Sequence, residues 1–267
     1  MAAVTVGRHR RRPRIGLALV VVLSCIYFFV PLWATAKAGF NVPGKGWTLK
    51  PLREVTADPL FSETLWLSFR LAIGTTIVSL ALMVPTMVWL HLRVPWMRPY
   101  AELVSVLPYV VPPIAMVAGV AKAFHTFLPQ VVTQNWGLIP LYVILALPFT
   151  YRALDSGLRA IDLRILVEAG RNLGAGWGRV LWTVVLPNVR TAALGAAFLT
   201  IAVVLGEFTI ASLLLHQTFP IYLAQVGSSE PQGAPALALL AIALTWAMLG
   251  IVTLLTRRRR ITLAPAS

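Results

Sequence analysis

The sequence predicts an all-α, polytopic membrane protein with six transmembrane helices and both termini in the cytoplasm. Its 267 residues have a mean hydropathy of +0.79, and only 12% of them are charged, against about 25% in a typical soluble domain. The apolar residues gather in six runs, and the lysines and arginines gather at the ends of these runs. The runs therefore indicate membrane spans, and the basic residues indicate the direction of each span.

The six spans follow from the lengths of the apolar runs. A transmembrane helix needs about 20 mainly apolar residues to cross a hydrocarbon core of about 30 Å. The first run, 15–35, exceeds the apolar region of about 7 to 15 residues that is usual in a signal peptide, so we expect it to be an uncleaved helix. The fourth span has the least defined start, because apolar residues extend back to Val131. The helices are expected at 15–36, 66–90, 100–127, 136–151, 194–215 and 236–256.

The segments between the spans set the predicted orientation. The tails at 1–14 and 257–267, the loop around Arg93 and Arg98, and the loop at 152–191 together hold 17 of the 23 lysines and arginines. The expected outer segments, of which 37–61 is the longest, hold four. Because basic residues concentrate on the cytoplasmic side, the two tails and the 152–191 loop are predicted to be cytoplasmic, and 37–61 to be external.

The 152–191 loop is a long polar insertion between apolar spans, and it has the pattern of two short helices joined by a glycine turn. Asp162 is a candidate N-cap, and Gly174 can adopt the left-handed conformation that ends a helix. The second helix is expected from about Trp177, with apolar residues at helical spacing on one face. Pro187 is expected to stop or kink that helix.

Seven residues of this loop have the spacing Glu-Ala-Gly, three residues, Gly, nine residues, Val, one residue, Leu-Pro. They are Glu168, Ala169, Gly170, Gly174, Val184, Leu186 and Pro187. This pattern resembles the EAA signature of bacterial type I ABC importer permeases. It differs at two positions: Gly170 stands where the signature has the second alanine of Glu-Ala-Ala, and Val184 stands where it has isoleucine. The resemblance covers about 62–256 and implies a five-helix permease core that includes the cytoplasmic coupling loop.

The resemblance also implies partners and a location. It implies a cytoplasmic ABC ATPase dimer, a second permease subunit that is identical or homologous, an external solute-binding protein and surrounding membrane lipid, all at a bacterial inner membrane. It implies no cofactor and no enzymatic activity in this chain, since ATP hydrolysis belongs to the partner. The residues expected to contact the ATPase are Glu168, Ala169, Gly170, Leu173, Gly174, Trp177, Leu186 and Pro187.

Two features inside the spans are candidates for the solute pathway. Pro112 and Pro113 interrupt the third span, and such a break is tolerated only where it meets protein or water. Glu207 is expected near the middle of the fifth span, where a carboxylate must face the interior of the bundle. It either senses a polar or cationic solute or fixes helix packing through hydrogen bonds. The residues around it resemble permeases for polyamines, thiamine, iron, sulfate and molybdate, and a cation such as a polyamine is the favoured solute.

Other function classes have little support in the sequence. Residues 39–45 read G-x-x-x-x-G-K, but Gly46 stands where a nucleotide site needs Ser or Thr, and no apolar strand precedes them. The net charge of +14 comes from arginines at membrane edges and not from a nucleic-acid-binding module. The alternative that remains open is an ion-coupled secondary transporter, which needs more ionisable residues within the spans than Glu207.

Overall fold

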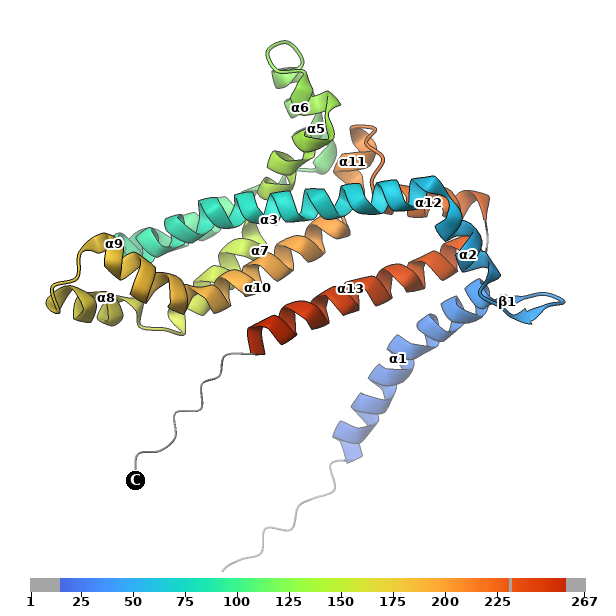
Figure 1. The fold of residues 1–267 in the computed structure, drawn as a ribbon, viewed down its shortest axis with the longest axis horizontal. Helices are drawn as coiled ribbons and strands as arrows, with labels where there is room; N and C mark the ends of the chain where they lie inside the picture. The colour runs from blue at the N-terminus through green and yellow to red at the C-terminus, as the bar shows by residue number, and fades with distance from the viewer. Residues whose placement is uncertain (1–14, 231, 258–267) are drawn as a thin grey trace, which may run out of the picture.

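A computed structural model describes residues 15–230 and 232–257, and in these ranges the chain is almost entirely helical (Figure 1). The expected tails at 1–14 and 258–267 lie outside the described residues. In chain order the elements are α1 Ile15–Phe40, β1 Asn41–Val42, β2 Gly46–Trp47, α2 Lys50–Ala57, α3 Pro59–Arg93, α4 Arg98–Val110, α5 Pro113–Phe124, α6 Gln130–Thr133, α7 Leu138–Arg159, α8 Leu163–Asn172, α9 Trp177–Val180, α10 Leu186–Leu205, α11 Thr209–Leu213, α12 Phe219–Ser229 and α13 Gly233–Arg257. Two 3-10 turns, Pro95–Met97 and Asn135–Gly137, and a π-helical segment, Leu181–Val185, complete the list.

The core of the molecule is the bundle of α3, α7 and α10, which lie side by side (Figure 1). Small residues allow α7 and α10 to approach closely: a Cβ on Gly157 of α7 would lie 2.2 Å from the Cβ of Ala192 on α10. Between the same helices, the buried hydroxyls of Thr150 and Thr200 are 3.0 Å apart and hydrogen-bonded. Close contact and buried hydrogen bonds of this kind replace the hydrophobic effect as the source of helix association in a membrane.

The helices of the described residues agree with a polytopic membrane protein. Four of them are long and apolar enough to cross a bilayer, a bent pair supplies a fifth candidate, and the shorter apolar helix Gly233–Ala247 belongs to α13. The all-α class is therefore confirmed. The number of six spans and the cytoplasmic position of both termini remain predictions.

The third predicted span, 100–127, is broken at Pro112 and Pro113, as the sequence indicated. Helices α4 and α5 meet at an angle of 91° on either side of Val111 and Pro112. Pro112 has no backbone N–H to donate, and a proline disfavours helical backbone in the residue before it, so α4 ends there and Pro113 begins a new helix. Helices α5 and α6 consequently project from the side of the bundle (Figure 1).

Pro187 was expected to stop or kink the second helix, and a stop is excluded because helical backbone continues from Trp177 to Leu205. The π-helical segment Leu181–Val185 lies immediately before the proline. Its wider turn accommodates a residue that has no N–H and a ring that would clash with an α-helical carbonyl. The loop predicted at 152–191 is also shorter than expected, since α7 runs on to Arg159.

Glu207 does not lie in the middle of a span. Helix α10 ends at Leu205, and Glu207 occupies the break before the short helix α11. The segment between the fifth and sixth predicted spans, 216–235, contains a regular helix, α12. Its Tyr222 hydroxyl donates to the carboxylate of Asp58 at 3.1 Å, and burial together with this carboxylate raises the pKa of Tyr222 to about 12. Tyr222 therefore remains a donor at physiological pH and attaches α12 to the start of α3.

The predicted external loop over 37–61 is also more ordered than expected. It contains the end of α1, the hairpin of β1 and β2, and the amphipathic helix α2. Gly44 and Gly46 adopt positive φ in the hairpin turn, and Gly39 lies against the backbone of α13, where a Cβ would be 2.6 Å from the nitrogen of Ala236. The glycines of the G-x-x-x-x-G-K pattern therefore serve a helix contact and a turn.

Candidate functional site

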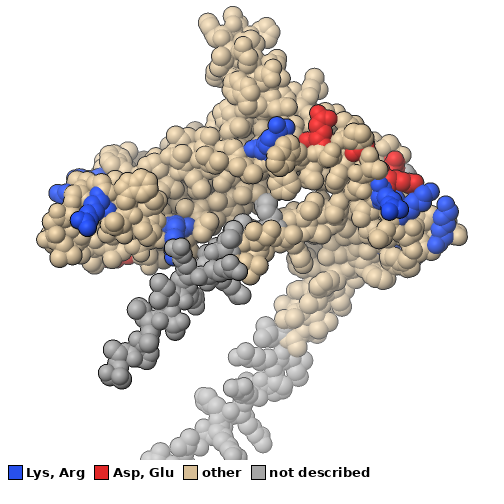
Figure 2. Space-filling view, in the orientation of Figure 1, with Lys and Arg blue, Asp and Glu red and all other residues tan. Residues whose placement is uncertain are grey.

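The candidate site is at the end of the bundle where α3 and α7 finish and where α8, α9 and α10 begin. We call it the α8 end, and we call the opposite end the α12 end. Figure 2 shows mainly basic side chains at the α8 end, whereas the α12 end carries acidic and basic side chains together.

Helix α8 and its turn form as the sequence predicts. The Asp162 carboxylate accepts a hydrogen bond from the backbone N–H of Ile165 at 3.4 Å, as an N-cap does. Gly174 has φ +83°, the left-handed conformation expected after the helix. Leu163 and Val167 are buried in the core cluster at this end, so one face of α8 is attached to the bundle. The turn is therefore held in a defined position.

The EAA-like residues lie on both faces of this helix pair. Glu168 and Ala169 are exposed, and the Glu168 carboxylate pairs with Arg164 one turn earlier at 3.2 Å. Gly170 faces the second helix, where a Cβ would meet Val180 and Val184 at 3.5 and 3.6 Å, an ordinary contact distance. Alanine, the residue of the signature, would therefore fit at position 170.

Apolar side chains are exposed at the tip of the pair. Leu173 is 88% exposed directly before Gly174, and Ile165 is 61% exposed on the outer face of α8. Leu186 and Pro187 are also exposed, at the start of α10. A rigid element that presents Leu173 in this way has the form of a docking surface.

Trp177 has a different position from Leu173. Its ring faces the end of α3, and the guanidinium carbons of Arg93 and Arg171 lie 5.0 and 5.1 Å from the ring centroid. Trp177 also lines a groove between α3 and α10 with a volume of about 940 Å³. It connects the helix pair with α3, and 39% of its surface remains exposed.

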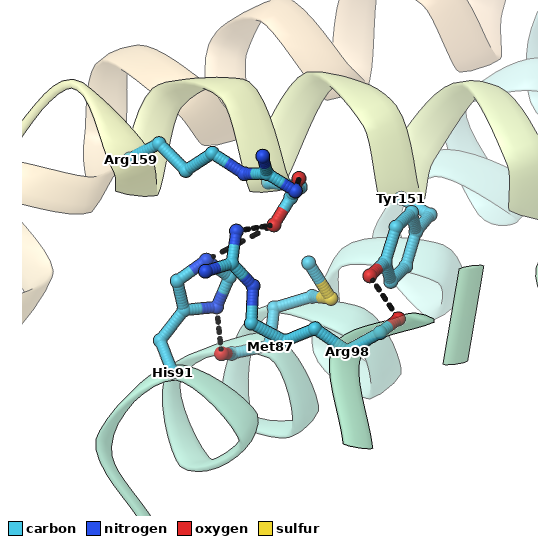
Figure 3. A network of polar contacts seen from close by, with 6 residues as sticks. Met87, His91, Arg98, Tyr151 and Arg159 are labelled. Atoms are coloured by element: carbon cyan, nitrogen blue, oxygen red, sulfur yellow. Dashed lines mark hydrogen bonds and ion pairs between the residues drawn. The ribbon is translucent and has the colours of Figure 1, made fainter. Parts of the chain in front are cut away.

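A buried network beside α8 joins three helices (Figure 3). Asp155 of α7 contacts His91 at the end of α3 at 3.1 Å, Arg98 at the start of α4 at 2.8 Å, and Arg159 at 2.6 Å. The Tyr151 hydroxyl donates to the backbone carbonyl of Arg98 at 2.9 Å. The network therefore holds the α3–α4 connection against α7, next to the point where α8 begins.

Sequence reasoning missed Asp155 as a structural centre. The spacing of Asp155 and Arg159 is a visible signal for an i, i+4 ion pair. His91 and Arg98 are 64 and 57 positions earlier, and no local pattern connects them with Asp155. Within the described ranges, no group of three or more His, Cys, Asp or Glu residues could hold a metal ion.

The pathway candidates lie away from the α8 end. Pro112 and Pro113 form the bend between α4 and α5, and α5 packs against α11. Glu207 precedes α11 and is 8% exposed. Its carboxylate oxygens accept from the backbone N–H groups of Ile210 at 2.7 Å and Ala211 at 3.3 Å. The bend and Glu207 are therefore connected through α11, which packs against α5 and follows Glu207. The carboxylate of Glu207 already accepts hydrogen bonds from backbone N–H groups.

Comparison with known proteins gives a family match over most of the chain. The family model described as "Binding-protein-dependent transport system inner membrane component" matches residues 68–261. The matched range contains the broken α4–α5 pair, the EAA-like helix pair and Glu207.

Three named relatives show the same kind of similarity. A probable ABC transporter permease protein, y4fN, of Sinorhizobium fredii is 27% identical over 94% of this chain and 46% of its own length. The thiamine transport system permease protein ThiP of Salmonella typhimurium is 23% identical over 93% of this chain and 46% of its own length. The Fe(3+)-transport system permease protein FbpB 2 of Haemophilus influenzae is 26% identical over 78% of this chain and 39% of its own length. The chain thus spans about half the length of the relatives it matches, or less.

Proposed function

The chain belongs to the family of binding-protein-dependent transport system inner membrane components, and we propose that it forms half of a solute pathway driven by a separate ATPase. It is a multi-pass membrane protein and the permease component of an ABC importer. The proposal adds that the helix pair α8–α9 is the contact with a cytoplasmic ATPase dimer, with Glu168, Ala169, Gly170, Gly174, Leu186 and Pro187 contributing to it. A second permease subunit and an external solute-binding protein would complete the importer.

The observation that carries the proposal is that one rigid helix exposes two apolar side chains, Leu173 and Ile165, together with Glu168. Burying a leucine against a partner is worth about 1.5 to 3 kcal/mol. Leu173 is 88% exposed at a glycine turn, on a helix attached through Leu163 and Val167. The attachment favours transmission of movement from a partner to α3 and α10, because these helices meet the buried face of α8 and its neighbouring turn.

The solute is proposed to be small and polar, with cations as the first class to test. Relatives are named for thiamine and for Fe(3+), and the sequence favoured a polyamine. The polyamine argument depended on a free Glu207 carboxylate, and the two backbone hydrogen bonds of that carboxylate support a packing role instead. Thiamine, ferric iron and polyamines should therefore be compared as uptake substrates, with an oxyanion as the contrasting class.

A pull-down of the cognate ATPase tests the proposed contact. Leu173→Asp is expected to reduce ATPase recovery at least tenfold, because a charge replaces the apolar anchor. Leu215→Asp is the matched control, since Leu215 is 91% exposed at the α12 end and should leave recovery unchanged. Equal recovery with both variants would contradict the proposal. Uptake that persists without ATP and follows a proton gradient would favour the ion-coupled alternative.

A further inference from the structure

The groove between α3 and α10 has a polarity that changes along its length. On α3 it extends from Ala81 to Arg93, a rise of about 18 Å at 1.5 Å per residue. This length is close to half of a hydrocarbon core of about 30 Å. Its walls are apolar, with Val84 and Val88 on α3 opposite Leu181 on the π-helical segment, and a charged residue, Arg93, lines it at the α8 end.

At the charged end, Arg93 lines the groove, and Arg171 lies beside the lining residue Trp177. Within the described residues, the side chains of Arg93 and Arg171 take part in no salt bridge or hydrogen bond, whereas Arg98, Arg159 and Arg164 pair with acids. The unpaired guanidiniums both lie about 5 Å from the ring of Trp177. Both contacts with the ring are cation–π interactions, and they leave the guanidinium N–H groups available to an anion.

Tryptophans surround the same end. Trp89, Trp177 and Trp182 all line the groove, with exposures of 56, 39 and 73%. Tryptophan favours the level of lipid headgroups, because the ring is apolar and the N–H is polar. The aromatic residues therefore mark the boundary between headgroup and acyl chain on this side of the bundle.

We infer that the groove is a binding site for an anionic phospholipid, with the phosphate at Arg93 and Arg171 and one acyl chain along α3 towards Ala81. From the α8 end towards Ala81, the arginines match the phosphate of such a lipid, the tryptophans match the boundary between headgroup and acyl chain, and the apolar walls match the acyl chain. A zwitterionic lipid carries its own cation and has no net charge, so it would gain less from the arginines than an anionic lipid. The inference depends on the membrane location of the family and is independent of the proposed ATPase contact.

Native mass spectrometry of the purified full chain in detergent, with phosphatidylglycerol or phosphatidylcholine added, tests the inference. The protein should retain phosphatidylglycerol preferentially. The double variant Arg93→Gln/Arg171→Gln should lower this retention at least about fivefold, the effect expected from losing one basic contact near an anionic surface. The control Arg152→Gln/Arg190→Gln removes the same charge from exposed positions outside the groove and should change retention less than twofold. Equal retention of the two lipids, or equal losses in both double variants, would overturn the inference.

Filling the groove gives an independent test of the acyl chain. Ala81→Phe should exclude a lipid with brominated acyl chains and so reduce quenching of the groove tryptophans. Leu82→Phe, at a neighbouring exposed position that does not line the groove, should leave quenching unchanged. If Ala81→Phe instead abolished self-association of the chain while lipid retention persisted, the groove would be a protein interface and the inference would be wrong.

Discussion

The two ends of the bundle each contain a buried carboxylate, and they stabilise it in opposite ways. Asp155 at the α8 end and Glu207 at the α12 end are both 8% exposed. Asp155 contacts side chains that come from α3, α4 and its own helix. Glu207 accepts from backbone N–H groups three and four residues ahead of it.

The difference shows how each end can respond to a partner. The Glu207 arrangement is local and caps α11, so it requires only a few residues of continuous chain. The Asp155 arrangement is long-range, because it exists only while the ends of α3, α4 and α7 remain together. A movement of α8 would therefore strain the Asp155 network directly, whereas it would reach α11 only through the packing of Ile210 and Ala211 in the core.

Replacing Asp155 should have the largest effect on stability. Asp155→Ala leaves His91 and Arg98 without their acid, and loss of one partner from a largely buried ion pair costs about 3 kcal/mol. Unfolding in detergent, followed by tryptophan fluorescence, measures the change in the free energy of unfolding. Asp155→Asn keeps an acceptor and should cost less. A change below about 1 kcal/mol for the alanine variant would show that the network contributes little.

Replacing Glu207 should have a smaller effect, because only local hydrogen bonds are lost. Glu207→Ala leaves the N–H groups of Ile210 and Ala211 buried without an acceptor, which costs about 2 kcal/mol. Glu207→Gln keeps one carbonyl oxygen and should recover about half of this loss. The same unfolding measurement applies. Loss of solute uptake in Glu207→Gln at unchanged stability would instead assign Glu207 to the pathway.

Gly170→Ala should stabilise the α8 end slightly. Glycine within a helix costs about 0.5 to 1 kcal/mol relative to alanine, and the space beside Val180 and Val184 accepts a methyl group. The expected gain in the free energy of unfolding is therefore about 0.5 to 1 kcal/mol, with ATPase recovery retained. Destabilisation would mean that α8 packs more tightly against the π-helical segment than these distances indicate.

The exposed pair of Arg164 and Glu168 should have the smallest effect. Both side chains are more than half exposed, so Arg164→Ala is expected to change the free energy of unfolding by less than about 0.5 kcal/mol. Arg164→Ala breaks an exposed arginine–carboxylate pair, and Asp155→Ala breaks a largely buried one. The two variants together therefore compare the contribution of this type of ion pair to stability in water and in the protein interior. An equal effect of the two substitutions would contradict the importance of burial.

Local features of the candidate site were predictable, and its long-range connections were not. The Asp162 cap, the Gly174 turn and the amphipathic α8 depend on neighbours within a few residues, which is why the sequence predicted them. The continuous helix through Pro187 was missed because a π-helical segment has no strong sequence signal. Glu207 was misplaced because an apolar run shows where a membrane segment lies and does not show where its helix ends.

By itself the sequence determined that this is an all-α membrane protein of the permease family, because hydropathy and motif spacing are properties of the linear chain. It also determined where the solvent-facing turn between two apolar spans would form. Only the tertiary structure decided that α4 and α5 bend by 91°, that Asp155 joins three helices, and that Arg93 and Trp177 meet beside a groove. The physical reason is that these features depend on which helix faces pack together, and a single sequence does not specify that pairing through local interactions.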